Sequence, residues 1–168
     1  MLFPLFFSGQ SGMKSKKPKW SEQDLLILHE LRKNSRNSLV NIARITSIPT
    51  SSVFDKVNTL QKNLIRKHVS ILDFSKIGYG LTAHYLLTAS KKAALKHFLL
   101  RHPNTNTISM VNNGTDYFVE AIFKNMKQAE EFSEELQQFG LKYYHEHYIA
   151  EEVKREDFLS KKDHIEMV

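Results

Sequence analysis

The sequence contains no cysteine, which excludes a disulfide framework, a thiolate metal site and a cysteine nucleophile and fits a reducing cytoplasm. It has no apolar run near the roughly 18 residues that a membrane-spanning helix requires. It also lacks a P-loop, a glycine-rich dinucleotide turn, a Gly-x-Ser-x-Gly element and a zinc-hydrolase spacing. We therefore expect no membrane partner, no cofactor, no metal and no enzymatic activity.

Positive charge is concentrated in the first half of the chain. Residues 1–72 carry twelve lysines and arginines against four acidic residues, a net charge of +8. Residues 73–168 carry twelve against fourteen, a net charge of −2. Because lysine and arginine displace counterions from a phosphate backbone, the first half is predicted to bind a polyanion; a merely solubilising surface is the alternative.

The beginning of the chain, residues 1–19, is predicted to be a disordered basic leader. The apolar MLFPLFF lacks the basic region and the length of a signal peptide, and it runs into the polar SGQSG. Met13, just before KSKKPKW, is an alternative start to Met1.

Three short helices are predicted between residues 20 and 65. The stretch WSEQDLLILHELRKN begins with the capping pair Ser21 and Asp24 and continues with leucines at helical spacing. Ser38 can cap a second helix, and Pro49 suits the start of a third. The third helix has one apolar face, expected to be buried, which consists of Val53, Val57, Leu60 and Leu64.

The outward face of this third helix is unusual for a solvated surface. Its side chains are mostly short and polar, with poor helix propensity: Thr50, Ser51, Ser52, Asp55, Lys56 and Asn58. A face selected for stability alone more often carries Glu, Lys, Gln and Ala. Short polar side chains at a helix N-terminus can approach phosphates and base edges, so a DNA-binding helix-turn-helix is favoured over a plain three-helix bundle.

After residue 65 the pattern changes from helical to extended. IRKHVSILDF is predicted to form an extended pair or wing, and a linker follows. The remaining pattern is strand, helix, strand, strand, helix, strand, with an Asn-Asn-Gly hairpin turn and with Ala94 on the inward side of its first helix. The fold class is therefore α+β, a winged helix-turn-helix followed by a ferredoxin-like βαββαβ domain. The predicted segments are the helix-turn-helix domain (20–72), the linker (73–80), the ferredoxin-like domain (81–152) and a charged tail, frayed or disordered (153–168).

Two histidines in the last predicted strand are candidate metal ligands. His145 and His147 would share one face of that strand, as a pair of ligands does. Since no third ligand is nearby in the sequence, surface or interface histidines are the preferred interpretation.

Residues 20 to 152 resemble the Lrp/AsnC (feast/famine) family of transcription regulators. The resemblance rests on SEQDLLILHELRKNSRNSLVNIARITSIPTSSVFDKVNTLQKNLI, the wing RKHVSILD, the hinge FSKIGYG and NNGTDYFVEAIF. It implies a helix-turn-helix that binds double-stranded DNA. It also implies a RAM-type domain that forms a homodimer or larger assembly and, in many members, binds an amino acid or similar small effector.

Carried over by position, the resemblance makes the third helix the recognition helix. It implies phosphate contacts from Arg36, Arg44, Arg66 and Lys67. It implies effector contacts near Asn113, Gly114 and Asp116. The chain departs from the family pattern at three positions: Ser47 replaces a turn glycine, Asn63 replaces a glycine and is expected in the same left-handed conformation, and Gly114 comes one position late in the G-x-x-D loop.

A sequence-specific transcription regulator is thus the leading hypothesis. Two alternatives share its architecture or its partner: an enzyme similar to sirohaem decarboxylases, and a non-specific protein that coats DNA. The net charge of the first half and the short polar face favour DNA over a catalytic role.

Overall fold

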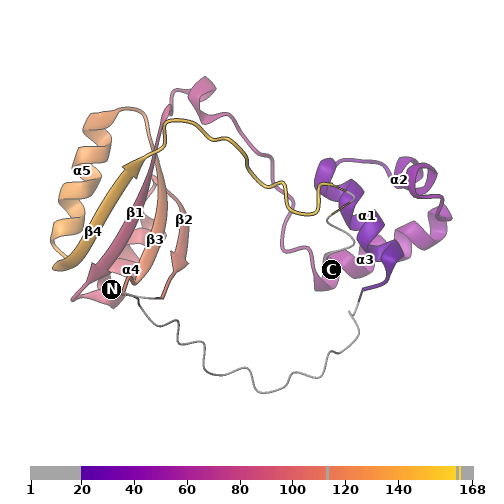
Figure 1. Cartoon of the computed structure of the whole chain (residues 1–168), viewed down its shortest axis with the longest axis horizontal. Coiled ribbons are helices and arrows are strands. Elements are labelled where there is room, and N and C mark those ends of the chain that lie inside the picture. Colours follow the sequence, from indigo (N-terminus) through magenta and orange to yellow (C-terminus); the bar gives the residue numbers. More distant parts are fainter. Residues whose placement is uncertain (1–19, 113, 162, 164–168) are drawn as a thin grey trace, which may run out of the picture. The chain divides into compact units, whose positions relative to one another are not determined.

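The computed structural model describes the chain from residue 20 to residue 163, apart from residues 113 and 162. The chain forms two compact units (Figure 1). The first runs to Val69 and resumes at Lys154, and the second is Ser70–Val153. The predicted leader, with its two candidate starts, lies outside the described residues.

The first helix, α1 (Glu22–Lys33), begins at the predicted capping pair. The Asp24 amide donates to Ser21 Oγ at 3.3 Å, and the Ser21 amide donates to Asp24 Oδ2 at 2.8 Å. Two backbone N–H groups are thereby satisfied reciprocally. Arg32 and Lys33 lie in the last turn, where positive charge suits the helix dipole. The predicted helix and its cap are confirmed.

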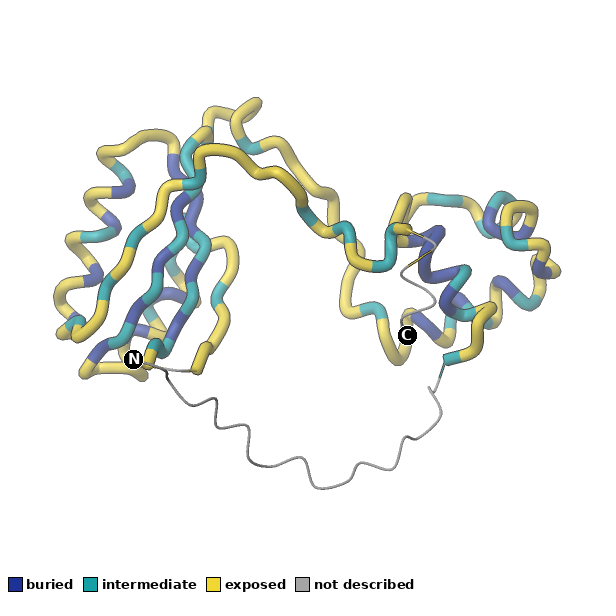
Figure 2. Tube along the Cα trace, in the orientation of Figure 1, coloured by how far each residue is buried: buried dark blue, intermediate teal, exposed yellow. Residues whose placement is uncertain are grey.

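Two further helices, α2 (Leu39–Thr46) and α3 (Thr50–Asn63), complete the first unit's helical bundle. Between them Ser47 has a φ of 57°, the left-handed conformation that glycine adopts without strain, so the turn is kept although a serine occupies it. The inner sides of the three helices share one apolar core (Figure 2). Its buried members are Ile27, Leu28, Leu31, Ile42, Ala43, Ile48, Val53, Val57 and Leu60.

The end of α3 corrects two predictions. Leu64, predicted to be buried, is 41% exposed, because it is the C-cap residue and the helical periodicity ends before it. Asn63, expected in the left-handed conformation, is the last helical residue and has no positive φ. Its side-chain amide donates to the Thr59 carbonyl oxygen at 2.8 Å, which holds it inside the last turn.

The predicted pair of wing strands is wrong, because residues 65–73 form no strand. Beyond Ile65 the segment is exposed along its whole length. A two-stranded ribbon without further packing is only marginally stable, which explains why the alternating pattern alone does not produce strands. The short 3-10 helix η1 (Phe74–Ile77) follows and ends at Gly78, whose φ of 87° favours glycine.

Besides η1, the described part of the second unit contains one four-stranded antiparallel sheet and two α-helices. Its elements are β1 (Leu81–Ala89), α4 (Lys92–Arg101), β2 (Thr105–Met110), β3 (Tyr117–Phe123), α5 (Met126–Gln137) and β4 (Leu141–Tyr148). The strand order is β2-β3-β1-β4, and the chain order is βαββαβ. Apart from the wing, the predicted α+β class and ferredoxin-like order are confirmed. No described helix is both long and apolar enough to cross a membrane.

The sheet buries one face under α4 and α5, as the alternating burial along β1 shows. The opposite face carries partly exposed side chains, among them His84, Leu86 and Phe118. Ala94, predicted to point inward, is exposed. The buried side of α4 is occupied instead by Leu95 and, one turn further along, by Leu99.

The C-terminal segment was expected to be frayed or disordered, but residues 154–161 pack against α1 within the first unit. Arg32 donates to the carbonyl oxygens of Phe158 at 3.1 Å and Glu156 at 2.7 Å. Nδ1 of His29, a buried side chain, lies 3.0 Å from the Leu159 carbonyl oxygen. The Leu159 side chain packs against the apolar core of the three helices. The segment is therefore an integral part of the helical unit.

We expect Leu159→Ala to lower the free energy of unfolding of the first unit by about 1 to 2 kcal/mol, because it removes apolar contacts at the edge of a core. Urea unfolding can be followed through Trp20, the single tryptophan, which packs against the same core. Val153→Ala is the matched control, because Val153 is 88% exposed. Equal midpoints for the two variants would show that the segment does not stabilise the unit.

Candidate nucleic-acid interface

The N-terminus of α3 is shaped by Pro49, its N-cap residue. The fixed φ of proline suits the entry into a helix, and this cap gives no side-chain hydrogen bond to the first turn. Thr50 and Ser51 are exposed there, and Ser52 is half-buried. Backbone N–H groups and hydroxyls therefore lie together at the positive end of the helix dipole, an arrangement suited to binding an anion.

The outer face of α3, which we define as Ser51, Phe54, Asp55 and Asn58, lies opposite the buried residues of the helix. Spacings of three, four and seven residues place these side chains on one side of an α-helix. Asp55 is exposed and Asn58 is half-buried. Of the six predicted polar side chains, Ser51, Asp55 and Asn58 thus share one accessible surface, Thr50 and Ser52 lie beside it in the first turn of the helix, and one is turned away toward another helix.

The exception is Lys56, whose ammonium turns toward the start of α1. Its Nζ lies 2.8 Å from Asp24 Oδ1 and 3.2 Å from Ser21 Oγ. Burial by itself would raise the pKa of the Asp24 carboxyl, but the hydrogen bonds from Lys56 and Ser21 outweigh it and lower that pKa below its ordinary value. Lys56 therefore has a structural partner 32 residues away in the sequence, which local pattern analysis could not identify.

The outer face of α3 also holds Phe54, which the sequence pattern did not lead us to predict there. Phe54 is 53% exposed, although it is a large aromatic side chain. Helical spacing alone would have predicted its exposure. Phe54 follows the buried Val53 by one residue and is therefore turned about 100° away from it on the helix.

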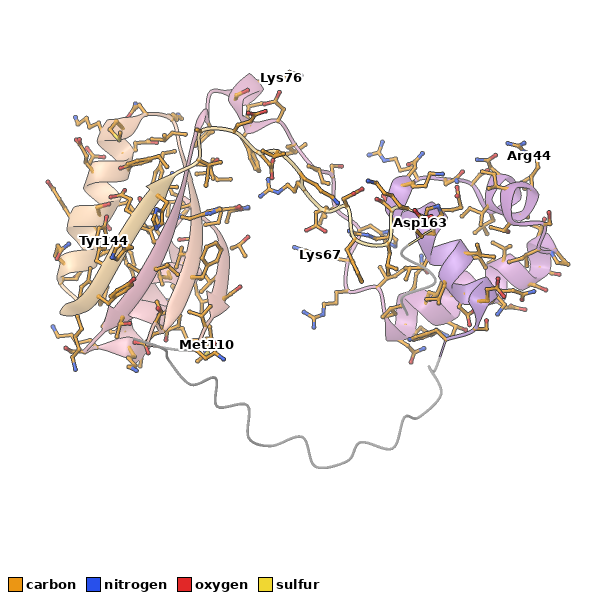
Figure 3. All side chains as sticks on the ribbon, in the orientation of Figure 1. Arg44, Lys67, Lys76, Met110, Tyr144 and Asp163 are labelled. Carbon is orange, nitrogen blue, oxygen red and sulfur yellow. The ribbon has the colours of Figure 1, made fainter. Side chains whose placement is uncertain are left out.

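The predicted phosphate contacts are all exposed, and they come from three parts of the first unit. Arg36 follows α1, Arg44 lies near the end of α2, and Arg66 and Lys67 follow α3. Arg44 donates to Asn41 Oδ1 at 2.8 Å, so its guanidinium keeps a defined direction while remaining accessible. Figure 3 labels Arg44 on α2 and Lys67 in the extended segment beyond α3.

The predicted effector loop lies between β2 and β3. Asn113 is outside the described residues. Gly114 has a φ of 92°, and its carbonyl oxygen accepts from Thr88 Oγ1 at 3.0 Å. Asp116 accepts from Lys92 Nζ at 2.6 Å and from the Ala89 amide at 3.3 Å; the bond from Lys92 lowers the pKa of the Asp116 carboxyl. Asp116 thereby ties the loop to β1 and α4.

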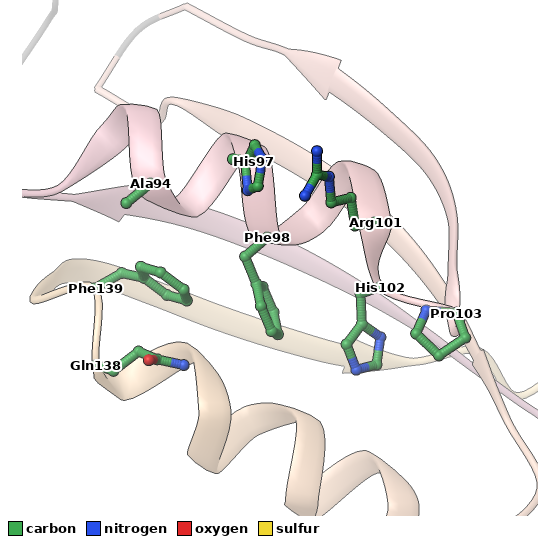
Figure 4. A pocket seen from close by; sticks show the side chains of 8 residues that line it. All are labelled: Ala94, His97, Phe98, Arg101, His102, Pro103, Gln138 and Phe139. Carbon is green, nitrogen blue, oxygen red and sulfur yellow. The ribbon is translucent and has the colours of Figure 1, made fainter.

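A hollow of about 540 Å³ lies beside α4 and the turn after α5 (Figure 4). The side chains of Phe98 and His102 point from α4 toward α5 (Figure 4), and Phe139 lies near Phe98 with 5.1 Å between ring centroids. Burial lowers the pKa of His102, although Glu135 opposes this. The hollow is thus bordered by an aromatic cluster that belongs to the core.

A group of hydroxyls surrounds Glu146 on β4. Its carboxylate accepts from Tyr144 and Tyr148, both at 2.6 Å, and from Tyr85 at 2.9 Å. Burial alone would raise the pKa of Glu146, but these hydrogen bonds outweigh it and the pKa lies below its ordinary value. The carboxylate is held in its charged form as part of a satisfied network that joins β4 to β1.

The paired histidines of β4 lie as the sequence predicted, on one side of the strand. The ring centroids of His145 and His147 are 6.0 Å apart, and Tyr143 stacks on His145 at 4.8 Å. Within the described ranges, no group of three or more histidine and carboxylate side chains is placed to hold a metal ion.

No family model matches the chain, but two sequence relatives cover most of it. It is 29% identical over 121 residues to an HTH-type transcriptional regulator of Pyrococcus horikoshii, a match covering 70% of the chain and 77% of the relative. A similar regulator of Pyrococcus abyssi is 27% identical over 121 residues, with the same shares covered.

Solved structures share both units of the fold. LrpC of B. subtilis superposes with a TM-score of 0.75 at 21% identity, over 81% of this chain and 98% of its own. A transcriptional regulator of Neisseria meningitidis in complex with L-Met gives 0.74 at 19% identity, over 81% and 93%. An AsnC family transcriptional regulator from Agrobacterium tumefaciens gives 0.73 at 14% identity, over 81% and 94%.

The ion pair between Lys56 and Asp24 predicts a change in acid stability. We expect Lys56→Gln to lower the free energy of unfolding at neutral pH by about 1 to 2 kcal/mol. A carboxyl whose pKa is lowered by folding stabilises the protein above its unfolded pKa, and this contribution is lost as the pH falls through the folded pKa. Without Lys56 the pKa of Asp24 in the folded protein rises toward its unfolded value. Protonation of Asp24 at low pH then lowers the free energy of unfolding by a smaller amount.

Urea unfolding followed through Trp20 fluorescence at pH values from about 2 to 7 measures this difference. Lys62→Gln is the control, because Lys62 is an exposed lysine on the same helix. A pH profile of Lys56→Gln that coincides with that of Lys62→Gln would contradict the structural role of Lys56.

Proposed function

We propose that this chain, whose two-unit fold is that of the Lrp/AsnC transcription regulators, is a sequence-specific regulator that binds double-stranded DNA as a homodimer or larger assembly. One observation carries the proposal: α3 buries one face completely, presents short polar side chains around Phe54 on the other, and has no side-chain hydrogen bond capping its N-terminus. The names of the Pyrococcus relatives as HTH-type transcriptional regulators support it.

In this proposal α3 enters the major groove. The hydroxyls and backbone N–H groups of Thr50, Ser51 and Ser52 bind phosphate at the edge of the groove, because the helix dipole favours an anion there. Asp55 can accept from the amino group of cytosine, and Asn58 can pair with adenine. Lys56 serves mainly to hold α3 against α1.

The exposed basic residues would supply the salt-dependent part of the affinity. Arg36, Arg44, Arg66 and Lys67 reach phosphates on either side of the groove. Each contact releases condensed counterions, so affinity falls steeply as salt is added. These contacts position the protein without reading sequence.

We extend the proposal to a small effector such as an amino acid. The neighbour from Neisseria meningitidis was solved with L-Met, which supports the idea for a chain of the same fold. Gly114 and Asp116 stay its predicted contacts, together with Asn113. Since Lys92 lies 2.6 Å from the Asp116 carboxylate, an effector that uses this carboxylate has to share it with Lys92 or displace it. A regulator of this kind acts in the cytoplasm, where bacterial and archaeal transcription takes place.

Selection of duplexes from a random DNA library tests the proposal directly. The full-length chain is expected to enrich a two-fold symmetric site and to bind it at least 1,000 times more tightly than unrelated DNA at a fixed salt concentration, in the usual range for specific regulators. Equal competition by unrelated DNA would identify a non-specific coat. If the chain binds a tetrapyrrole but no DNA, the regulator hypothesis is wrong and the enzyme hypothesis takes its place.

Removing one phosphate contact should change the salt dependence of binding. We expect Arg66→Ala to weaken binding to the preferred site and to unrelated DNA by the same factor, and to reduce the slope of log Kobs against log salt by about 0.9. Arg101→Ala is the matched control, because Arg101 is an exposed arginine on α4 of the second unit. Fluorescence anisotropy at several salt concentrations gives both slopes, and an unchanged slope for Arg66→Ala rules out its phosphate contact.

Removing a base contact should change specificity instead. Asn58→Ala is expected to weaken binding to the preferred site by about 1 to 3 kcal/mol and to leave binding to unrelated DNA nearly unchanged, because the paired amide reads a base edge. The measurement is the ratio of the two dissociation constants, with Arg66→Ala as the contrasting variant. A loss of the same size on both DNAs would remove Asn58 from base readout.

A further inference from the structure

Phe54 stands in the middle of the outer face of α3. It follows Ser51 by three residues and precedes Asn58 by four, so it is flanked on the same side of the helix by two short polar side chains. It is 53% exposed, whereas its neighbour Val53 is fully buried. The most apolar side chain of this face is therefore surrounded by the side chains proposed to contact DNA.

Folding does not account for a phenylalanine at this position. The apolar core of the first unit is closed by α1, α2 and the inner side of α3, and Phe54 is outside that cluster. Aromatic residues have lower helix propensity than Ala, Leu, Glu or Lys, so local helix stability gives no reason for it either. Exposed aliphatic residues such as Val40 occur elsewhere in the unit, but not between the polar residues of α3.

The chemistry of the major groove offers one apolar feature that a side chain can read, the C5-methyl group of thymine. A phenylalanine ring reaches further from the helix than the neighbouring serine and aspartate side chains. It can therefore bury a methyl group while its polar neighbours make hydrogen bonds to adjacent bases and phosphates.

We propose that Phe54 determines part of the DNA specificity by contact with the C5-methyl group of a pyrimidine, which is a thymine in unmodified DNA. The inference rests on the proposed function, because it requires that α3 lie in the major groove. The inference adds three things to the proposed function: a preferred base, the methyl group on that base and the residue that recognises this group.

The test uses the full-length chain and the duplex enriched from a random library. Each thymine of that duplex is replaced in turn by deoxyuridine, which removes the methyl group and keeps the base pair, and the dissociation constant is measured by fluorescence anisotropy. Burial of one methyl group corresponds to a loss of about fourfold in affinity. We expect a loss of this size at one thymine in each half-site.

The same scan is then repeated with variants. Phe54→Ala is expected to bind the thymine duplex about as weakly as the wild type binds the deoxyuridine duplex, and to show no further loss when that thymine is replaced. Phe54→Leu keeps an apolar side chain and retains the response. Val40→Ala, which changes a side chain 69% exposed on α2, responds like the wild type.

The possible outcomes distinguish failure of the role of Phe54 from failure of the proposed function. A wild-type protein that binds its preferred duplex but tolerates deoxyuridine at every thymine overturns the role of Phe54 and leaves the regulator in place. The same conclusion follows if Phe54→Ala keeps the wild-type loss at the sensitive thymine. If no duplex is enriched at all, the proposed function fails first, and the role of Phe54 fails with it.

Discussion

Burial of one side of α3 is the constraint on which the first unit depends. Val53 and Leu60 are almost fully removed from solvent, and they lie on the side of α3 that packs against α1 and α2. A rotation of α3 by one residue, about 100°, would expose Val53 and bury Phe54. Since a close-packed core does not tolerate such an exchange, the direction of the outer face is fixed by the core. The core therefore gives the proposed DNA-binding surface a fixed direction, although its short polar residues have poor helix propensity.

The charged side chains of the first unit fall into two groups, those that hold its elements together and those that stay exposed. Lys56 and Asp24 form a largely shielded pair that joins α3 to the start of α1, and Arg32 holds the C-terminal segment through backbone oxygens. Arg44 and Arg66 stay exposed. The net positive charge of the first half therefore overstates the number of cations available to a polyanion, because some of them are engaged in folding.

The second unit provides a sheet with one covered face and one accessible face. The covered face is closed by α4 and α5, while the accessible face carries Leu86 and Phe118 at positions only partly shielded from solvent. Apolar residues on such a face suit an interface between two copies of the chain, which supports the proposed homodimer. The hydroxyl network around Glu146 keeps a charged group at the edge of this unit without a cation.

The sequence by itself determined the helices and strands other than the wing, their order and the polar residues on the outer face of α3, since capping pairs, periodicity and turn residues act within a few positions. The helix after Ser21, the strand from Leu81 and the similarity of the fold to that of Lrp/AsnC regulators are confirmed. Only the tertiary structure decided that Lys56 pairs with Asp24, that residues 65–73 form no strand, and that Leu159 packs on the helical core. These outcomes depend on contacts between residues far apart in the chain, or on a strand partner, and no local pattern contains that information.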